Sequence, residues 1–314
     1  MTVNASELKF FAQLKIEMQN NPPKSLSDMT LEEYRQGVSA FINFSGPAAQ
    51  VPYEELFTPA RDGHLIKVRI YDPQPQKVGP ILIMYPGCGY ACDLFEVNCI
   101  SASRIAKYSQ CKVAMIDFRL APECPLPQAI YDGYDATEYL ATHAQEHFIH
   151  PNQIMIGGLS SGASCAASVA LLASAQQDWD ICQQILLNGC YDFTHQLHAY
   201  QEFEQHDFLL NEESKLHLFG LLQEGNVELS DPIISPVYHH HLKNLPPTTI
   251  MVGEYDGLRS QSEGFYDLLL KSGANVNKIL LKGQTHNTLI MMEVLPEDED
   301  LARIIADLML KPFS

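Results

Sequence analysis

Basic residues are scarce in this sequence. Its 314 residues include 20 Lys and Arg against 38 Asp and Glu, so the formal net charge is −18 at pH 7. A surface this acidic repels phosphate backbones and anionic membranes, which excludes nucleic acid as an expected partner. Long apolar runs are also lacking, since none reaches the ~18 residues that a membrane-spanning helix needs. We therefore expect no membrane span.

Signals for export are missing as well. The first 21 residues contain Lys9, Lys15 and Glu17 and no uninterrupted apolar segment, unlike a secretory signal. The eight cysteines are scattered, in a chain too long to need disulfides, and several, such as Cys111 and Cys165, have apolar neighbours. This pattern favours reduced thiols over a disulfide framework. We expect a cytoplasmic protein.

What the sequence does contain is material for a large core, because 46% of its residues are hydrophobic. Short apolar runs alternate with helical patterns, which is typical of βαβ units and a mostly parallel sheet flanked by helices. The expected strands are Ile66–Tyr71, Ile81–Tyr85, Lys112–Asp117, Gln153–Gly157, Gln184–Asn188, Thr248–Gly253 and Asn277–Leu281. The expected helices among and after them are Tyr131–Ala144, Ser161–Ser174, Ser262–Ser272, capped by Gly273, and Asp298–Leu310.

Two stretches interrupt this alternation. Residues 1–50 predict N-terminal cap helices, the second with Thr30 and Glu33 at capping-box spacing. Residues 193–235, with a helical Glu212–Leu222, predict a cap insertion. Residues 51–192 and 236–314 then form the catalytic domain. We expect both insertions to cover the strand ends as a lid, and the alternative is that they only extend the surface.

The most specific motif is Gly158-Leu159-Ser160-Ser161-Gly162, between a predicted strand and a predicted helix. In that context, G-x-S-x-G is the sharp turn that exposes a nucleophilic serine, and the helix N-terminus faces the developing negative charge. The segment from Gly157 to Ser164 also approaches a phosphate-binding loop, but Ala163 stands where that motif needs lysine. We therefore interpret Ser160 as a nucleophile.

A nucleophilic serine needs a base and an acid that orients the base. Of the 12 histidines, the only one after residue 241 is His286, just past the last predicted strand, and Asp256 follows the strand before it. Both lie at carboxyl ends of strands, where open α/β sheets bind ligands, and in the chain order Ser, Asp, His. By contrast, no ligand spacing surrounds His239, His240 and His241, so we predict no metal site.

The third requirement is a set of N–H donors for the oxyanion of an acyl-transfer intermediate. The segment Pro86-Gly87-Cys88-Gly89-Tyr90 follows the strand Ile81–Tyr85, and its glycines allow the backbone to turn N–H groups inward. The N–H of Ser161 is the second expected source of donors.

These motifs together resemble the hormone-sensitive-lipase-like branch of the α/β-hydrolases, over nearly the whole chain. Pro86–Gly89 stands where that branch has His-Gly-Gly-Gly, and the other matching segments are Asp117–Glu123, Gly158–Gly162 and Glu254–Arg259. The resemblance implies an α/β-hydrolase fold with a helical cap. It also implies an oxyanion hole formed by Cys88, Gly89 and Ser161, with Asp117–Glu123 supporting the oxyanion loop and Arg119 paired to an acid.

Four residues depart from the family pattern: Pro86 replaces histidine, Cys88 and Ala163 replace glycines, and Leu159 replaces an acid. The resemblance still implies a serine carboxylesterase for short- to medium-chain acyl esters, with Ser160, His286 and Asp256 as the triad and with no metal or organic cofactor. The alternatives are an amidase or formamidase with the same triad, and a non-catalytic binder of this fold. The expected partner is a small-molecule ester, and a homodimer stays open.

Overall fold

The computed structural model describes residues 3–20, 22, 24–175, 179–194, 210, 212–291 and 297–311. Its centre is a sheet of eight strands in the order β1-β2-β4-β3-β5-β6-β7-β8. The strands are β1 (Tyr53–Pro59), β2 (Leu65–Tyr71), β3 (Gly79–Tyr85), β4 (Lys112–Asp117), β5 (Ile149–Leu159), β6 (Gln183–Leu187), β7 (Thr248–Gly253) and β8 (Val276–Leu281).

The sheet is mostly parallel, as predicted. Strands β3 to β8 pair in parallel, and β2 alone runs against its neighbours β1 and β4. From β3 the chain passes to β4 on one side and then to β5 on the other, so the strand order reverses between β3 and β5. In open α/β sheets such a reversal opens a crevice at the carboxyl ends of the strands.

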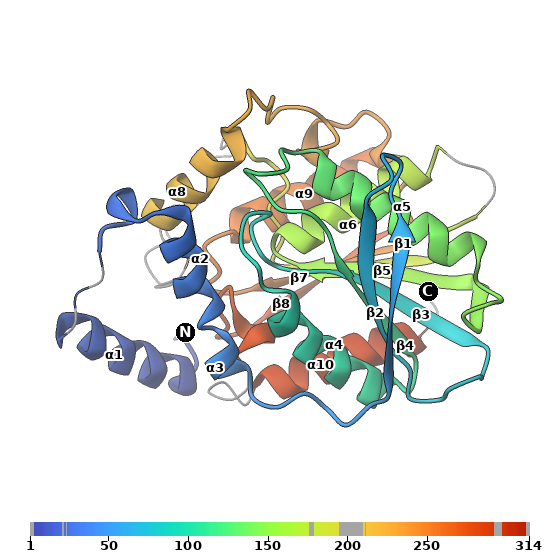
Figure 1. Ribbon diagram of the computed structural model, residues 1–314, viewed down its shortest axis with the longest axis horizontal. Helices are drawn as coiled ribbons and strands as arrows, with labels where there is room; N and C mark the ends of the chain where they lie inside the picture. The colour runs from blue at the N-terminus through green and yellow to red at the C-terminus, as the bar shows by residue number, and fades with distance from the viewer. Residues whose placement is uncertain are drawn as a thin grey trace.

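Helices cover both faces of the sheet. α4 (Phe95–Ser109) and α10 (Glu297–Leu310) pack against each other on one face, and α5 (Gln128–Thr142), α6 (Ser161–Ala173) and α9 (Arg259–Ser272) lie on the other (Figure 1). The predicted cap of α9 is confirmed, because Gly273 has a φ of 81° and ends the helix in the left-handed conformation. Across the described ranges no helix is long and apolar enough to cross a bilayer.

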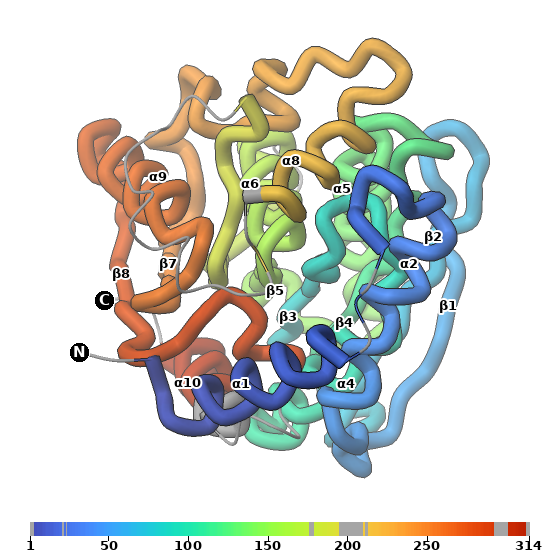
Figure 2. Tube along the Cα trace, turned by 90° about the vertical axis from the view of Figure 1, so that its left-hand side faces the viewer, coloured from blue at the N-terminus to red at the C-terminus, as the bar shows by residue number. Residues whose placement is uncertain are grey.

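The remaining helices lie together at one end of the sheet. They are α1 (Ala5–Asn20), α2 (Leu31–Ser39), the short α3 (Ile42–Ser45) and α8 (Glu212–Gln223), and Figure 2 shows α1, α2 and α8 in front of the strands. The capping box of α2 is present as predicted, since Thr30 and Glu33 exchange hydrogen bonds. Residues 195–209 and 211 of the predicted insertion lie outside the described residues, so its boundaries stay a prediction.

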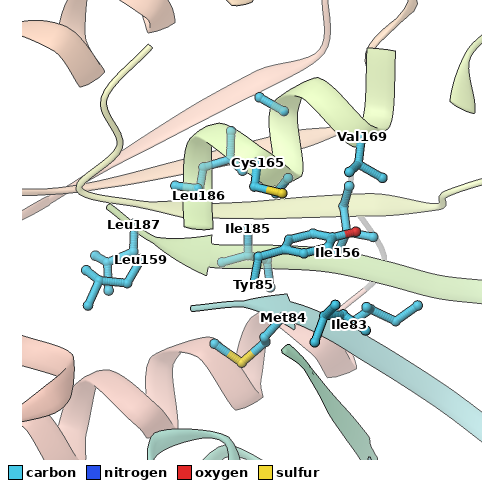
Figure 3. Packing of buried hydrophobic residues seen from close by; sticks show 14 of the residues in the cluster. Ile83, Met84, Tyr85, Ile156, Leu159, Cys165, Val169, Ile185, Leu186 and Leu187 are labelled. Carbon is cyan, nitrogen blue, oxygen red and sulfur yellow. The ribbon is translucent and has the colours of Figure 1, made fainter. Parts of the chain in front are cut away.

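The core lies between the sheet and its helices. Neighbouring residues on β3 point to opposite faces: Tyr85 faces Cys165 and Val169 of α6, and Met84 faces the other helix layer (Figure 3). The fully buried Tyr85 hydroxyl lies 2.7 Å from the Thr137 hydroxyl of α5. This packing fixes the end of β3 against the start of α6.

Candidate active site

Ser160 occupies the turn between β5 and α6. Its φ of 57° and ψ of −124° lie in a region that residues other than glycine rarely adopt, so the surrounding packing must hold it there. Glycines flank it because there is no room for side chains: a Cβ on Gly162 would collide with the carbonyl oxygen of Tyr85, and one on Gly158 would collide with Gly162. The predicted sharp strand-to-helix turn is therefore present.

The structure brings the three predicted residues of the triad together. The Nε2 atom of His286 lies 2.9 Å from the Ser160 hydroxyl oxygen, and its Nδ1 atom lies 2.8 Å from a carboxylate oxygen of Asp256. His286 is 4% exposed and Asp256 is fully buried. A carboxylate can only accept, so Nδ1 carries the proton and Nε2 is left to accept the proton of the serine. This is the arrangement that activates a serine for attack on a carbonyl carbon.

Sequence reasoning missed Asn188, which joins the loops that carry the acid and the base. It follows β6, is fully buried, and has a left-handed φ of 49°, which asparagine tolerates better than most residues. Its side-chain amide donates to the carbonyl oxygens of His286 (2.9 Å) and Thr285 (3.3 Å), and its side-chain oxygen accepts from the Gly253 N–H (2.8 Å). The only sequence signal was an asparagine at the end of a buried apolar strand.

The three predicted oxyanion donors lie at the end of β3 and the start of α6. Gly89 has a φ of 59°, and Ser161 is the first residue of α6, where N–H groups have no partner within the helix. The Cys88 N–H donates to the Ser161 hydroxyl at 3.1 Å. A second hydrogen bond holds the loop against α4: the Gly87 N–H donates to the buried Asn98 side chain at 3.0 Å. Without substrate, the Ser161 hydroxyl therefore accepts a hydrogen bond from the Cys88 N–H, which is one of the expected oxyanion donors.

The cysteines beside this loop are buried thiols. Burial raises the pKa of Cys88 well above its ordinary value and raises the pKa of Cys92 to about 12. A thiol rather than a thiolate is a poor nucleophile at neutral pH. The raised pKa of Cys88 therefore argues against this thiol as the nucleophile of the site.

The segment Asp117–Glu123 supports the oxyanion loop. The Ala121 N–H donates to the Tyr90 carbonyl at 2.8 Å. Arg119 pairs with the fully buried Asp132 at 2.6 Å and with Asp62 at 2.8 Å, as predicted for an arginine paired to an acid. Because these bonds anchor the segment to α5, they fix the position of the loop that it touches.

The triad opens into a cavity of about 110 Å³ with a mostly apolar lining. The N-terminal helices contribute Tyr34, Val38 and Phe41, and α8 contributes Ser214 and Leu218. Leu218 lies directly on Gly89, where an added Cβ would collide with it. Both predicted cap segments thus line the space above Ser160, which agrees with a lid rather than a mere extension of the surface.

In the part of the chain that the structure describes, no group of three or more His, Cys, Asp and Glu side chains could hold a metal ion. The rings of His239 and His241 lie 5.7 Å apart, and the Nδ1 atom of His239 accepts the His241 N–H at 3.1 Å. The Nδ1 atom of His239 is therefore occupied by a hydrogen bond and is not free to bind a metal ion.

Known proteins match both the sequence and the fold. The model of the alpha/beta hydrolase fold family matches residues 82–290. The carboxylic ester hydrolase LipN of Mycobacterium tuberculosis is 28% identical over 254 residues, which is 79% of this chain and 67% of LipN. An arylesterase of Saccharolobus solfataricus is 24% identical over 257 residues, covering 81% of this chain and 83% of the relative.

Among solved structures, an ester hydrolase from the metagenome of Lake Arreo superposes with a TM-score of 0.90 at 22% identity, over 98% of both chains. The family match includes the end of β3 from Leu82, the serine turn and the loops that follow β7 and β8. The chain therefore belongs to the hormone-sensitive-lipase-like branch of the alpha/beta hydrolase fold family.

Proposed function

We propose that this protein, a carboxylic ester hydrolase of its family, cleaves short- to medium-chain acyl esters with Ser160 as the nucleophile, His286 as the base and Asp256 as the acid. The observation that carries the proposal is the continuous hydrogen-bonded chain from Ser160 through His286 to Asp256. Relatives named esterase or ester hydrolase support the type of reaction.

In the first half-reaction, the Ser160 oxygen attacks the ester carbonyl carbon while the Nε2 atom of His286 takes the serine proton. The negative charge on the former carbonyl oxygen is stabilised by the N–H groups of Cys88, Gly89 and Ser161. His286 then gives its proton to the leaving alkoxide, and the alcohol departs. Asp256 keeps the imidazole in the required orientation and stabilises its positive charge.

In the second half-reaction, His286 removes a proton from water, and the resulting oxygen nucleophile attacks the acyl-enzyme. The tetrahedral intermediate uses the same N–H donors and collapses to the carboxylic acid and free Ser160. Every proton passes through the same nitrogen, so the cycle needs no group beyond the residues named.

The preference for short acyl chains is supported by the cavity. It is small, at about 110 Å³, and Leu218 and Phe41 are among the apolar side chains that line it. An acyl chain of a few carbons buries its methylenes against these side chains, at about 0.8 kcal/mol for each methylene. A long chain has no room unless the cap moves.

We also propose a reducing, cytoplasmic setting. All eight cysteines are free thiols, and six of them are buried. Such thiols persist where glutathione keeps the environment reducing.

The test compares Ser160→Ala, His286→Ala and the wild-type protein on p-nitrophenyl esters from acetate to palmitate and on the matching anilides. Ser174→Ala, at the far end of α6, is the matched control. We expect butyrate or a shorter ester to be the best substrate, and each triad variant to lose about 10⁴-fold in kcat. Ser160→Ala should form no adduct with an organophosphonate, His286→Ala should form it far more slowly than the wild type, and Ser174→Ala should form it at the wild-type rate.

Full turnover by Ser160→Ala, with folding intact by circular dichroism, would contradict the proposed nucleophile. Anilide cleavage faster than ester cleavage would identify an amidase. Tight binding of esters without turnover by the wild-type protein would identify a binder.

A further inference from the structure

Glu7 is the buried residue of helix α1. Glu7 is 1% exposed, whereas the apolar Leu8 and Ile16 of the same helix are 50% and 58% exposed. Burial of a carboxylate costs several kcal/mol unless hydrogen bonds compensate for the lost water. Phe10 of α1 packs against Phe44, with ring centroids 5.1 Å apart, and the contacts of the buried carboxylate are the second source of its placement.

Those contacts are with the loop that carries the catalytic base. The N–H of Thr285, the residue before His286, donates to a Glu7 carboxylate oxygen at 3.2 Å. One turn earlier, the Asn4 N–H donates to the Gly283 carbonyl at 2.9 Å. Figure 2 shows α1 beside the orange-red segment that follows β8. The N-terminal helix thus binds both ends of a three-residue stretch that leads into His286.

The same stretch is held from the opposite side by the loop that carries the acid. The Tyr255 N–H donates to the Gln284 carbonyl at 2.9 Å, and the Gly283 N–H donates to a Glu254 carboxylate oxygen at 2.9 Å. The peptide group between Gln284 and Thr285 is therefore fixed at its oxygen by Tyr255 and at its nitrogen by Glu7. Without Glu7, its buried N–H loses the acceptor and the peptide group is held on one side only.

We propose that Glu7 is a positioning residue for His286: its carboxylate holds the Thr285 peptide so that the imidazole reaches Ser160 and Asp256 together. The inference rests on the proposed triad. The position of the Glu7 carboxylate oxygen is decisive, because it sets the position of the Thr285 peptide and so of His286. A shift of about 1 Å in a catalytic group costs on the order of 100-fold in rate.

Two variants, Glu7→Gln and Glu7→Asp, separate the effect of the position of the acceptor oxygen from the effect of its charge. Glu7→Gln keeps an oxygen at the same distance and removes the charge, whereas Glu7→Asp keeps the charge and withdraws the oxygen by one carbon–carbon bond, about 1.5 Å. Glu7→Ala removes both. Glu17→Ala is the matched control, since Glu17 is an exposed glutamate of the same helix that pairs only locally with Gln13.

With p-nitrophenyl butyrate, we expect Glu7→Gln to keep kcat within about threefold of wild type, and Glu7→Asp and Glu7→Ala to lose about tenfold or more. KM should stay within about twofold in all variants, because Glu7 does not line the cavity. Glu17→Ala should match wild type. Rates are compared per folded molecule, by circular dichroism and gel filtration.

A Glu7→Asp variant faster than Glu7→Gln, or a Glu7→Ala variant with wild-type kcat, would overturn the inference. Proton NMR gives a readout without substrate: the downfield signal of the His286 Nδ1 proton should persist in Glu7→Gln and shift or vanish in Glu7→Asp. A wild-type protein that hydrolyses no ester would count against the proposed function alone, and the NMR comparison would still decide on Glu7.

Discussion

Ser161 contributes two groups with opposed effects on catalysis. Its N–H is one of the proposed oxyanion donors, but its hydroxyl accepts the N–H of Cys88, which is another. An oxyanion that forms beside Ser160 must take the Cys88 N–H from that hydroxyl or share it. The Ser161 hydroxyl therefore competes with the oxyanion for the Cys88 N–H.

The variant Ser161→Ala should remove this competition. A neutral hydrogen bond contributes about 1 kcal/mol net, so kcat for p-nitrophenyl acetate should rise about two- to tenfold. Steady-state kinetics on wild type and variant gives the comparison, with Ser174→Ala as the control because Ser174, just past α6, donates to the Leu171 carbonyl at 2.8 Å. A fall in kcat would mean that the hydroxyl supports the loop more than it competes.

Cys88 differs from the family pattern, and its thiol has no proposed role. We expect Cys88→Gly to retain activity within about tenfold, or ~1.4 kcal/mol of barrier, with any loss due to added backbone freedom. Because burial raises the pKa of this thiol, iodoacetamide at pH 8 should modify the exposed Cys182 first. Loss of turnover in Cys88→Gly, combined with an active Ser160→Ala, would assign the chemistry to the cysteine.

At the scale of elements, α2 does more than line the cavity. The guanidinium of Arg35 donates to the carbonyl oxygens of Ala91 (2.7 Å) and Ala121 (2.8 Å) and pairs with Glu123 (2.6 Å). It therefore ties a cap helix to the oxyanion loop and to the segment that supports that loop. The planar, forked shape of the arginine side chain allows three partners at once.

We expect Arg35→Ala to lower kcat/KM for p-nitrophenyl butyrate by about tenfold, since the oxyanion loop loses its tie to α2. Arg35→Lys should recover little, because one ammonium group cannot reach all three partners. The control is Arg104→Ala, which removes a half-buried arginine that donates to the Pro47 carbonyl. Equal rates in Arg35→Ala and wild type would show that the loop stands without α2.

Much of this architecture could be predicted from the sequence. The strands Lys112–Asp117 and Thr248–Gly253 are confirmed to the residue, because continuous apolar runs mark strands that are buried on both faces. The pairing of Arg119, which the family resemblance implied, and the cap at Gly273, which has a local signal, are also confirmed. Ser160 could be chosen from its motif between a strand and a helix, and Asp256 and His286 from their places after successive strands and the chain order Ser, Asp, His.

The elements that the sequence analysis did not predict, such as β1 and α4, lack such signals. Strand β1 lies at the edge of the sheet and is largely exposed, so Glu54 and Glu55 interrupt any apolar pattern. Helix α4 buries the polar residues Asn98, Ser101 and Ser103, so its buried face does not show the apolar periodicity that predicts a helix. The side-chain hydrogen-bond partners of Asn188 and Glu7 lie between 65 and 278 residues away, and no rule of sequence spacing covers such separations.

At the scale of the whole molecule, the net charge of −18 should select among substrates. The protein's field repels an anionic ester and leaves a neutral one unaffected, and salt screens that field beyond about 10 Å at 0.1 M. We expect kcat/KM for an anionic p-nitrophenyl monoester of a dicarboxylic acid to rise about two- to fivefold between 0.01 M and 0.2 M salt. The value for p-nitrophenyl acetate should stay constant, and a parallel rise for both would point to an effect of salt on the protein itself.

The order in which the site's parts occur along the chain has a consequence for synthesis on the ribosome. Ser160 is made 126 residues before its base, and the contact between Glu7 and Thr285 spans 278 residues. A nascent chain thus displays its serine turn and its first helices well before residue 286 leaves the exit tunnel. Until then the chain lacks the proposed base, so we expect unfinished chains to hydrolyse no ester. On the proposed triad, hydrolysis begins only once residue 286 has reached Ser160.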